Sequence, residues 1–125
     1  MPPIITLIPI IVALLIIGLA LPLAMGRVPP NAFYGYRTRA SRGSPTLWYA
    51  TNRVAARWMM IVGACVIAIV TTMNLIGAAP VMTLLVGANL MAIGAVLSAV
   101  RAWRLERRLA SGLSGEDQDP TPRPS

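Results

Sequence analysis

Three long apolar segments constrain what this 125-residue chain can fold into. They cover residues 4–25, 58–79 and 81–103, and the first contains no charged residue. Because a helix of about 20 apolar residues crosses the hydrocarbon core of a bilayer, each segment is long enough to be a membrane span. Pro80 separates the last two segments, which predicts a tight turn and an antiparallel hairpin. We therefore expect an all-α membrane protein with three transmembrane helices.

The composition agrees with this class and narrows the possible chemistry. The chain is 56% hydrophobic and 12% charged, whereas a soluble domain is roughly a quarter charged. It has one cysteine and no histidine, so we expect no metal site and no haem or other cofactor. Without paired carboxylates beside its arginines or a glycine-rich phosphate loop, the chain is not expected to be an enzyme or to have catalytic residues.

The arginines predict how the chain is oriented in the plasma membrane. Six arginines lie between Arg27 and Arg57, and four more lie between Arg101 and Arg108 after the third segment. The N-terminal flank and residues 73–80 contain none. Because basic flanks stay on the cytoplasmic side, we expect a multi-pass protein with its N-terminus outside and its C-terminus in the cytoplasm. Membrane anchoring also explains the positive charge, so no nucleic-acid partner is expected.

An interfacial amphipathic helix is predicted to lead into the second span. Ser44 is a favourable N-cap and Pro45 suits the first helical position. Apolar and arginine side chains then fall on different faces at spacings of three and four. Residues 26–57, here called the motif region, should form a cytoplasmic loop within a membrane domain of residues 1–110. The small, polar, proline-rich tail of residues 111–125 is expected to be disordered.

The order of residues in the motif region is more specific than positive charge requires. An asparagine follows a proline pair, then come a glycine–tyrosine–arginine–threonine step, a serine, a tryptophan and an asparagine–arginine pair. These residues are Asn31, Gly35, Tyr36, Arg37, Thr38, Ser41, Trp48, Asn52 and Arg53. Asn31 and Thr38 are expected to fix the loop backbone through side-chain hydrogen bonds. The whole pattern resembles the signature of the SdpI family of bacterial integral membrane proteins.

The resemblance implies a function in the membrane but no reaction. The family's namesake gives immunity to a secreted peptide toxin and also relays a signal by holding a repressor at the membrane. The expected function is therefore toxin immunity or signalling through the cytoplasmic loop. Its partners would be the lipid bilayer and either a peptide toxin or a cytoplasmic regulator. Two alternatives remain, an accessory or structural subunit of a larger membrane complex and, with less support, a small transporter.

Arg37 and Arg53 are the candidate residues for binding an anion or a partner. An arginine fork can hold a lipid phosphate or a carboxylate through two parallel hydrogen bonds. A loop that folds back on the following helix would place Arg37 near Asn52 and Arg53. Tyr36 and Trp48 would then form the walls of the site. Alternatively, both arginines bond loop carbonyls and only lock the loop, and the sequence leaves these two interpretations open.

Within the spans, Asn89 is the polar residue that stands out. It lies about 13 Å along the third span from Pro80, near the middle of the membrane. An asparagine there is a functional candidate, but is more often a hydrogen-bond partner of another helix. Small residues recur on the same span at spacings of four, three and four, namely Ala88, Ala92, Ala95 and Ala99. Such a stripe lets another helix approach, either within the chain or in a homo-oligomer.

Overall fold

The computed structural model describes residues 3–116, which form helices joined by short connections. The elements are η1 (Ile4–Leu7), α1 (Ile8–Ala24), α2 (Arg39–Gly43), α3 (Pro45–Leu75) and α4 (Pro80–Glu116). The described part of the chain contains no strand. Three stretches, Ile4–Ala24, Pro45–Leu75 and Pro80–Ser114, contain apolar windows long enough to cross a membrane. The expected all-α fold with three spans is therefore confirmed.

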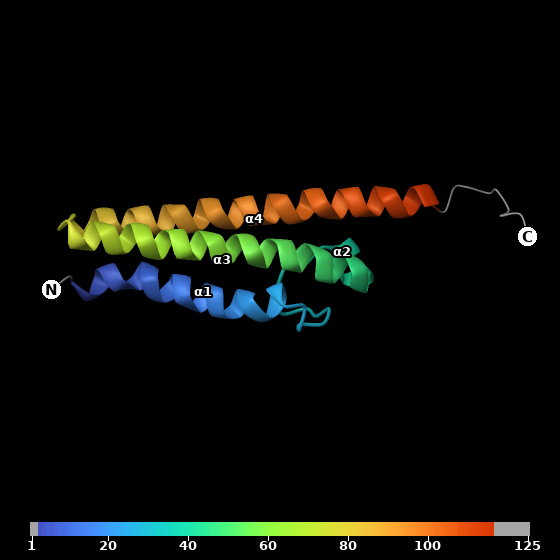
Figure 1. Cartoon of the computed structure of the whole chain (residues 1–125), viewed down its shortest axis with the longest axis horizontal. Helices are drawn as coiled ribbons and strands as arrows, with labels where there is room; N and C mark the ends of the chain where they lie inside the picture. The colour runs from blue at the N-terminus through green and yellow to red at the C-terminus, as the bar shows by residue number, and fades with distance from the viewer. Residues whose placement is uncertain (1–2, 117–125) are drawn as a thin grey trace, which may run out of the picture.

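The three long helices lie side by side, and α3 packs against both α1 and α4 (Figure 1). The α3–α4 turn lies at the same end of the bundle as the start of α1, and α2 lies toward the other end (Figure 1). Close to the N-terminal end, Pro9 of α1 packs on Gly87 of α4. Away from this contact, α1 and α4 touch each other little, and each packs mainly on α3.

Helix α3 contains both the predicted amphipathic segment and the predicted second span. It runs from Pro45 to Leu75 without a break, so the helix begins well before residue 58. Ser44 is the N-cap, because its side chain accepts a hydrogen bond from the Leu47 N–H at 3.4 Å. No proline interrupts the segment after Pro45, and the helical hydrogen bonds therefore continue directly into the membrane.

Helix α4 extends to Glu116, beyond the point where the disordered tail was expected to begin. The expectation of disorder is therefore wrong for residues 111–116. Ser111 and Ser114 donate hydrogen bonds to carbonyls about one turn earlier, at 2.9 and 3.0 Å, and so fit within the helix instead of ending it. The remainder of the expected tail, residues 117–125, lies outside the described residues.

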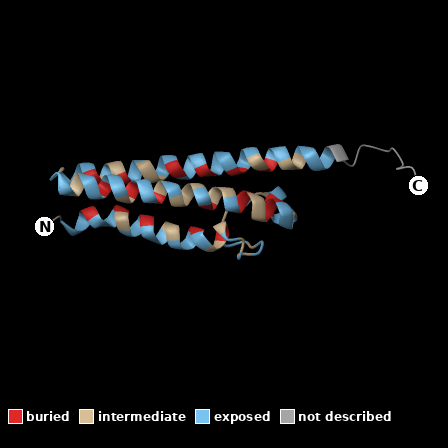
Figure 2. Ribbon diagram, viewed as in Figure 1, coloured by how far each residue is buried: buried red, intermediate tan, exposed pale blue. Residues whose placement is uncertain are grey.

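The small residues that pack α4 on α3 lie outside the alanine stripe. Thr83, Ser98 and Ala102 are buried on this face, and Gly94 lies so close to α3 that a Cβ there would be 2.2 Å from Val62 Cγ1. The alanine stripe at positions 88, 92, 95 and 99 is exposed instead. Figure 2 shows the buried residues of α4 along the side that faces α3. The smallest side chains decide which face packs, because they allow the closest approach of two helices.

Candidate functional site

Residues 25–44, here called the connector, join α1 to α3 and include α2. The connector begins with a turn at Gly26, whose φ of +68° is favourable for glycine at a helix end. A Cβ at Gly26 would be 3.0 Å from Arg53 Nη2, so the guanidinium of Arg53 lies against the end of α1. A cation at this position interacts favourably with the C-terminal end of a helix dipole.

Asn31 holds the next part of the connector in a turn. Its Oδ1 accepts hydrogen bonds from the backbone N–H groups of Phe33 and Tyr34, at 2.8 and 3.0 Å. Its Nδ2 donates to the Pro29 carbonyl at 2.9 Å. One side chain thus satisfies three backbone groups, which confirms the expectation that Asn31 fixes the connector backbone.

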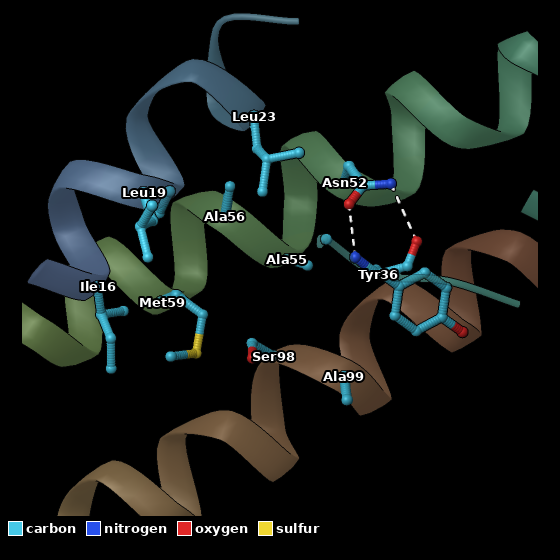
Figure 3. Close-up of a pocket in the computed structure, with 12 residues that line it drawn as sticks. Ile16, Leu19, Leu23, Tyr36, Asn52, Ala55, Ala56, Met59, Ser98 and Ala99 are labelled. Carbon is cyan, nitrogen blue, oxygen red and sulfur yellow. Dashed lines mark hydrogen bonds between the residues drawn. The ribbon is translucent and has the colours of Figure 1, made fainter. Parts of the chain in front are cut away.

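Asn52 of α3 binds the connector at the backbone of Tyr36 (Figure 3). The Tyr36 N–H donates to Asn52 Oδ1 at 2.6 Å, and Asn52 Nδ2 donates to the Tyr36 carbonyl at 3.0 Å. The same Nδ2 donates to the Trp48 carbonyl at 3.0 Å, and the Asn52 side chain is 2% exposed. The amide therefore pairs with both backbone groups of one residue, as a neighbouring strand would, in a segment without regular secondary structure.

Gly35 makes this pairing possible. A Cβ at position 35 would be 2.5 Å from Asn52 Oδ1, which is closer than nonbonded atoms approach. Gly35 also has a φ of +106°, a conformation that side chains disfavour. Both facts explain why a glycine stands just before the tyrosine in the motif.

Trp48 of α3 is buried and bonds the first part of the connector. Its side chain is 0% exposed, and its Nε1 donates a hydrogen bond to the Val28 carbonyl at 2.9 Å. The indole therefore holds the first part of the connector on α3. It belongs to the internal support of the connector and is not among the residues that line the cavity between α1, α3 and α4.

Thr38 and Ser41 form the start of α2 and link it to α4. Each side chain accepts a hydrogen bond from the backbone N–H of the other residue, at 3.0 and 2.9 Å, which is a capping box. The Thr38 hydroxyl also donates to Glu106 Oε1 at 2.7 Å. Glu106 is 7% exposed, so this bond between the connector and α4 is nearly excluded from solvent.

Glu106 is a site residue that the sequence analysis missed. Its carboxylate comes from α4, and its partner Thr38 is 68 residues earlier in the chain. The sequence feature that could have indicated Glu106 is its position as a single acid among the four arginines between residues 101 and 108. Within residues 3–116, Oε2 of Glu106 has no hydrogen-bond partner.

The phenol of Tyr36 lies in the same cluster. Its ring lies over α4 beside Ala99 (Figure 3). Burial raises the pKa of Tyr36 to about 12, and the neighbouring Glu106 carboxylate contributes in the same direction. The phenol is therefore neutral at physiological pH, because its charged form is disfavoured both by desolvation and by a nearby negative charge.

Arg37 bonds a carbonyl of its own loop. Its Nη1 donates to the Ala32 carbonyl within the connector. The connector folds back on α3 as expected, but the residue that pairs with Asn52 is Tyr36, the neighbour of Arg37, through its backbone. Because Gly35 lets the Tyr36 backbone approach Asn52 closely, both Oδ1 and Nδ2 of Asn52 bond backbone groups. This contact fits the loop-locking interpretation, and a binding role for Arg37 and Arg53 stays a prediction.

A cavity of about 370 Å³ lies between α1, α3 and α4 beside the connector. Side chains of Leu19, Leu23 and Met59 give it apolar walls, and Tyr36 and Asn52 lie at its connector end (Figure 3). The Asn52 amide is saturated by backbone groups, so the cavity offers mainly apolar contact. It suits a hydrocarbon chain or an apolar side chain better than an anion. No group of three metal-ligating side chains occurs in the described chain.

The family comparison covers this site. A family model described as the SdpI/YfhL protein family matches residues 27–110. This range contains the connector from Arg27 onward, all of α3 and most of α4, including Asn52, Glu106 and Asn89. No curated protein and no solved structure matches the chain.

The pairing of Asn52 with Tyr36 predicts how the connector responds to trypsin. In the Asn52→Leu variant the Tyr36 N–H loses its partner, and the Tyr36 carbonyl keeps only the 3.5 Å hydrogen bond from the Ser41 hydroxyl. This loss favours opening of the connector by about 1–3 kcal/mol. Cleavage after Arg37, Arg39 and Arg42 should then be about five- to a hundredfold faster in detergent micelles, followed by mass spectrometry.

Asn74→Leu is the matched control for this digestion. Asn74 also lies in α3, and its side chain makes no hydrogen bond within the described residues. This variant should be cleaved at the rate of the unmodified protein. Equal rates for Asn52→Leu and Asn74→Leu would contradict the proposed role of Asn52.

The raised pKa of Tyr36 predicts a pH-dependent loss of stability. Between about pH 10 and 12 the unfolded chain ionises its tyrosine while the folded protein keeps Tyr36 neutral, so stability falls as the pH rises. Replacing Tyr34 and Tyr49 by phenylalanine leaves Tyr36 as the tyrosine whose ionisation the absorbance reports. Its midpoint should be near 12, and lower but still above 10 after Glu106→Gln. An unchanged midpoint in the Glu106 variant would show that the carboxylate does not act on the phenol.

Proposed function

The chain belongs to the SdpI/YfhL protein family, and we propose on this basis that it protects its host membrane against a secreted peptide toxin. We propose the orientation that the arginines predict, with the connector and the C-terminus in the cytoplasm. Trypsin should then cleave the connector in inverted membrane vesicles but not in intact cells. The proposal includes no catalytic step.

The observation that carries the proposal is the coupling of the connector to the membrane helices. Asn52 attaches the connector to α3 and Glu106 attaches it to α4, both through hydrogen bonds of buried side chains to partly buried connector residues. Tyr36 belongs to this coupling and also lines the cavity between the helices. Binding of a ligand in the cavity would therefore affect the connector through Tyr36.

The cavity supports a membrane-inserted peptide as the ligand. Its walls are apolar side chains of α1 and α3, and its volume of about 370 Å³ accommodates one or two large apolar side chains. A peptide that enters the bilayer carries such side chains, whereas a charged solute would find no free polar partner at Asn52. Binding of the peptide beside Tyr36 would remove it from the lipid phase, where it causes damage.

A relay to a cytoplasmic regulator is the second candidate function, and the exposed part of the connector favours it. Phe33 is 88% exposed on the turn held by Asn31, and Arg37 and Arg39 are also exposed. An aromatic residue on a rigid, basic turn is suited to bind another protein, because little conformational entropy is lost. In this candidate function, peptide binding would shift Tyr36 and change the surface that the regulator recognises.

An exposure assay tests immunity directly. A toxin-sensitive host expressing the protein is treated with a peptide toxin encoded in the same genome as this chain. The unmodified protein and Asn74→Leu should give survival, whereas Asn52→Leu should lose most of the protection at equal membrane abundance. Equal killing with and without the unmodified protein would exclude immunity to that peptide.

A further inference from the structure

Helix α4 presents a seam of exposed residues on the side away from α3. Its members alternate at spacings of four and three, and they are Leu85, Asn89, Ala92, Val96, Ala99 and Trp103. The side of α4 that packs on α3 is a different one and contains the buried Gly94 and Ser98. A repeat of four and three is the heptad pattern by which two helices pack along their length at about 20°.

Asn89 is the member of this seam that requires a partner. Among the hydrogen bonds of residues 3–116 its side chain makes one, from Nδ2 to the Leu85 carbonyl of its own helix at 2.8 Å. Its Oδ1 therefore receives no hydrogen bond within the described chain. Asn89 lies about 13 Å from the start of α4, at a depth where the bilayer offers no water to complete the amide. The expected interhelical partner of this asparagine is thus absent from the α1–α3–α4 bundle.

We propose that the seam binds a second copy of this chain as a parallel α4–α4 dimer. Copies inserted in the same orientation place their α4 helices parallel and in register about a two-fold axis along the membrane normal. Asn89 then faces the same residue of the second copy. An amide carries both a donor and an acceptor, so an identical amide is its hydrogen-bond complement.

The neighbours of Asn89 in the seam agree with this arrangement. Ala92 and Ala99 are small and exposed, which allows the two helix backbones to approach each other. A single asparagine in an otherwise apolar seam also fixes the register of the pair, because any shift separates the two amides. The seam borders the cavity at Ala99, which also lies beside Tyr36. The dimer is argued from α4 alone and does not rest on the proposed function.

Cysteine cross-linking in membranes tests the seam. In a Cys65→Ser background, Ala92→Cys is compared with Leu97→Cys, an exposed position about 7.5 Å further along α4 and about 140° around the helix. Oxidation with copper phenanthroline should link Ala92→Cys into a product of twice the chain mass and leave Leu97→Cys mainly uncoupled. Equal yields at both positions, no product at either, or a product of Ala92→Cys with a different protein would overturn the proposal.

Asn89→Leu tests the role of the amide. This substitution removes a side chain whose described hydrogen bond stays within its own helix, so the fold of each chain is retained. The association constant, measured by single-molecule photobleaching in liposomes over a range of protein-to-lipid ratios, should fall about three- to tenfold. Asn74→Leu, a second asparagine of the membrane helices, should leave association unchanged. An unchanged association constant in Asn89→Leu would remove the asparagine pair from the interface.

Discussion

The two hydrogen bonds between the Asn52 amide and the Tyr36 backbone are the interaction on which the rest of the structure depends. The connector has little regular secondary structure of its own, and without Asn52 the backbone of Tyr36 would have no partner in α3. This pairing requires Gly35, because a side chain at that position would collide with the amide. Once the Tyr36 backbone is fixed, its ring is directed to α4 and the following Thr38 reaches Glu106.

This arrangement joins a polar connector to two membrane helices. Trp48 and Asn52 support the connector from α3, and Glu106 binds it from α4. Buried hydrogen bonds of this kind are costly to break singly, because the remaining partner stays desolvated. The connector is therefore held against both helices, next to the cavity that Tyr36 lines.

The sequence predicted the membrane fold because span length follows directly from bilayer thickness and apolar composition. It also predicted the capping role of Ser44 and the turn held by Asn31, since these act over two or three residues. It could not decide whether the Tyr36 backbone or the Arg37 side chain would meet Asn52, because both are compatible with the same spacing. Glu106 was missed because its partner is distant in sequence. The sequence left open whether the alanine stripe packs within the chain, because it does not show that Gly94 gives α3 the closest approach.

Hydrogen–deuterium exchange at the Tyr36 amide, followed by NMR in micelles, tests the central claim most directly. The account expects this N–H, bonded to Asn52 Oδ1, to exchange about a hundredfold more slowly than the N–H of the exposed Ala32 in the same connector. Comparable exchange at the two positions, after correction for intrinsic rates, would show that Asn52 does not hold the connector and would contradict the account.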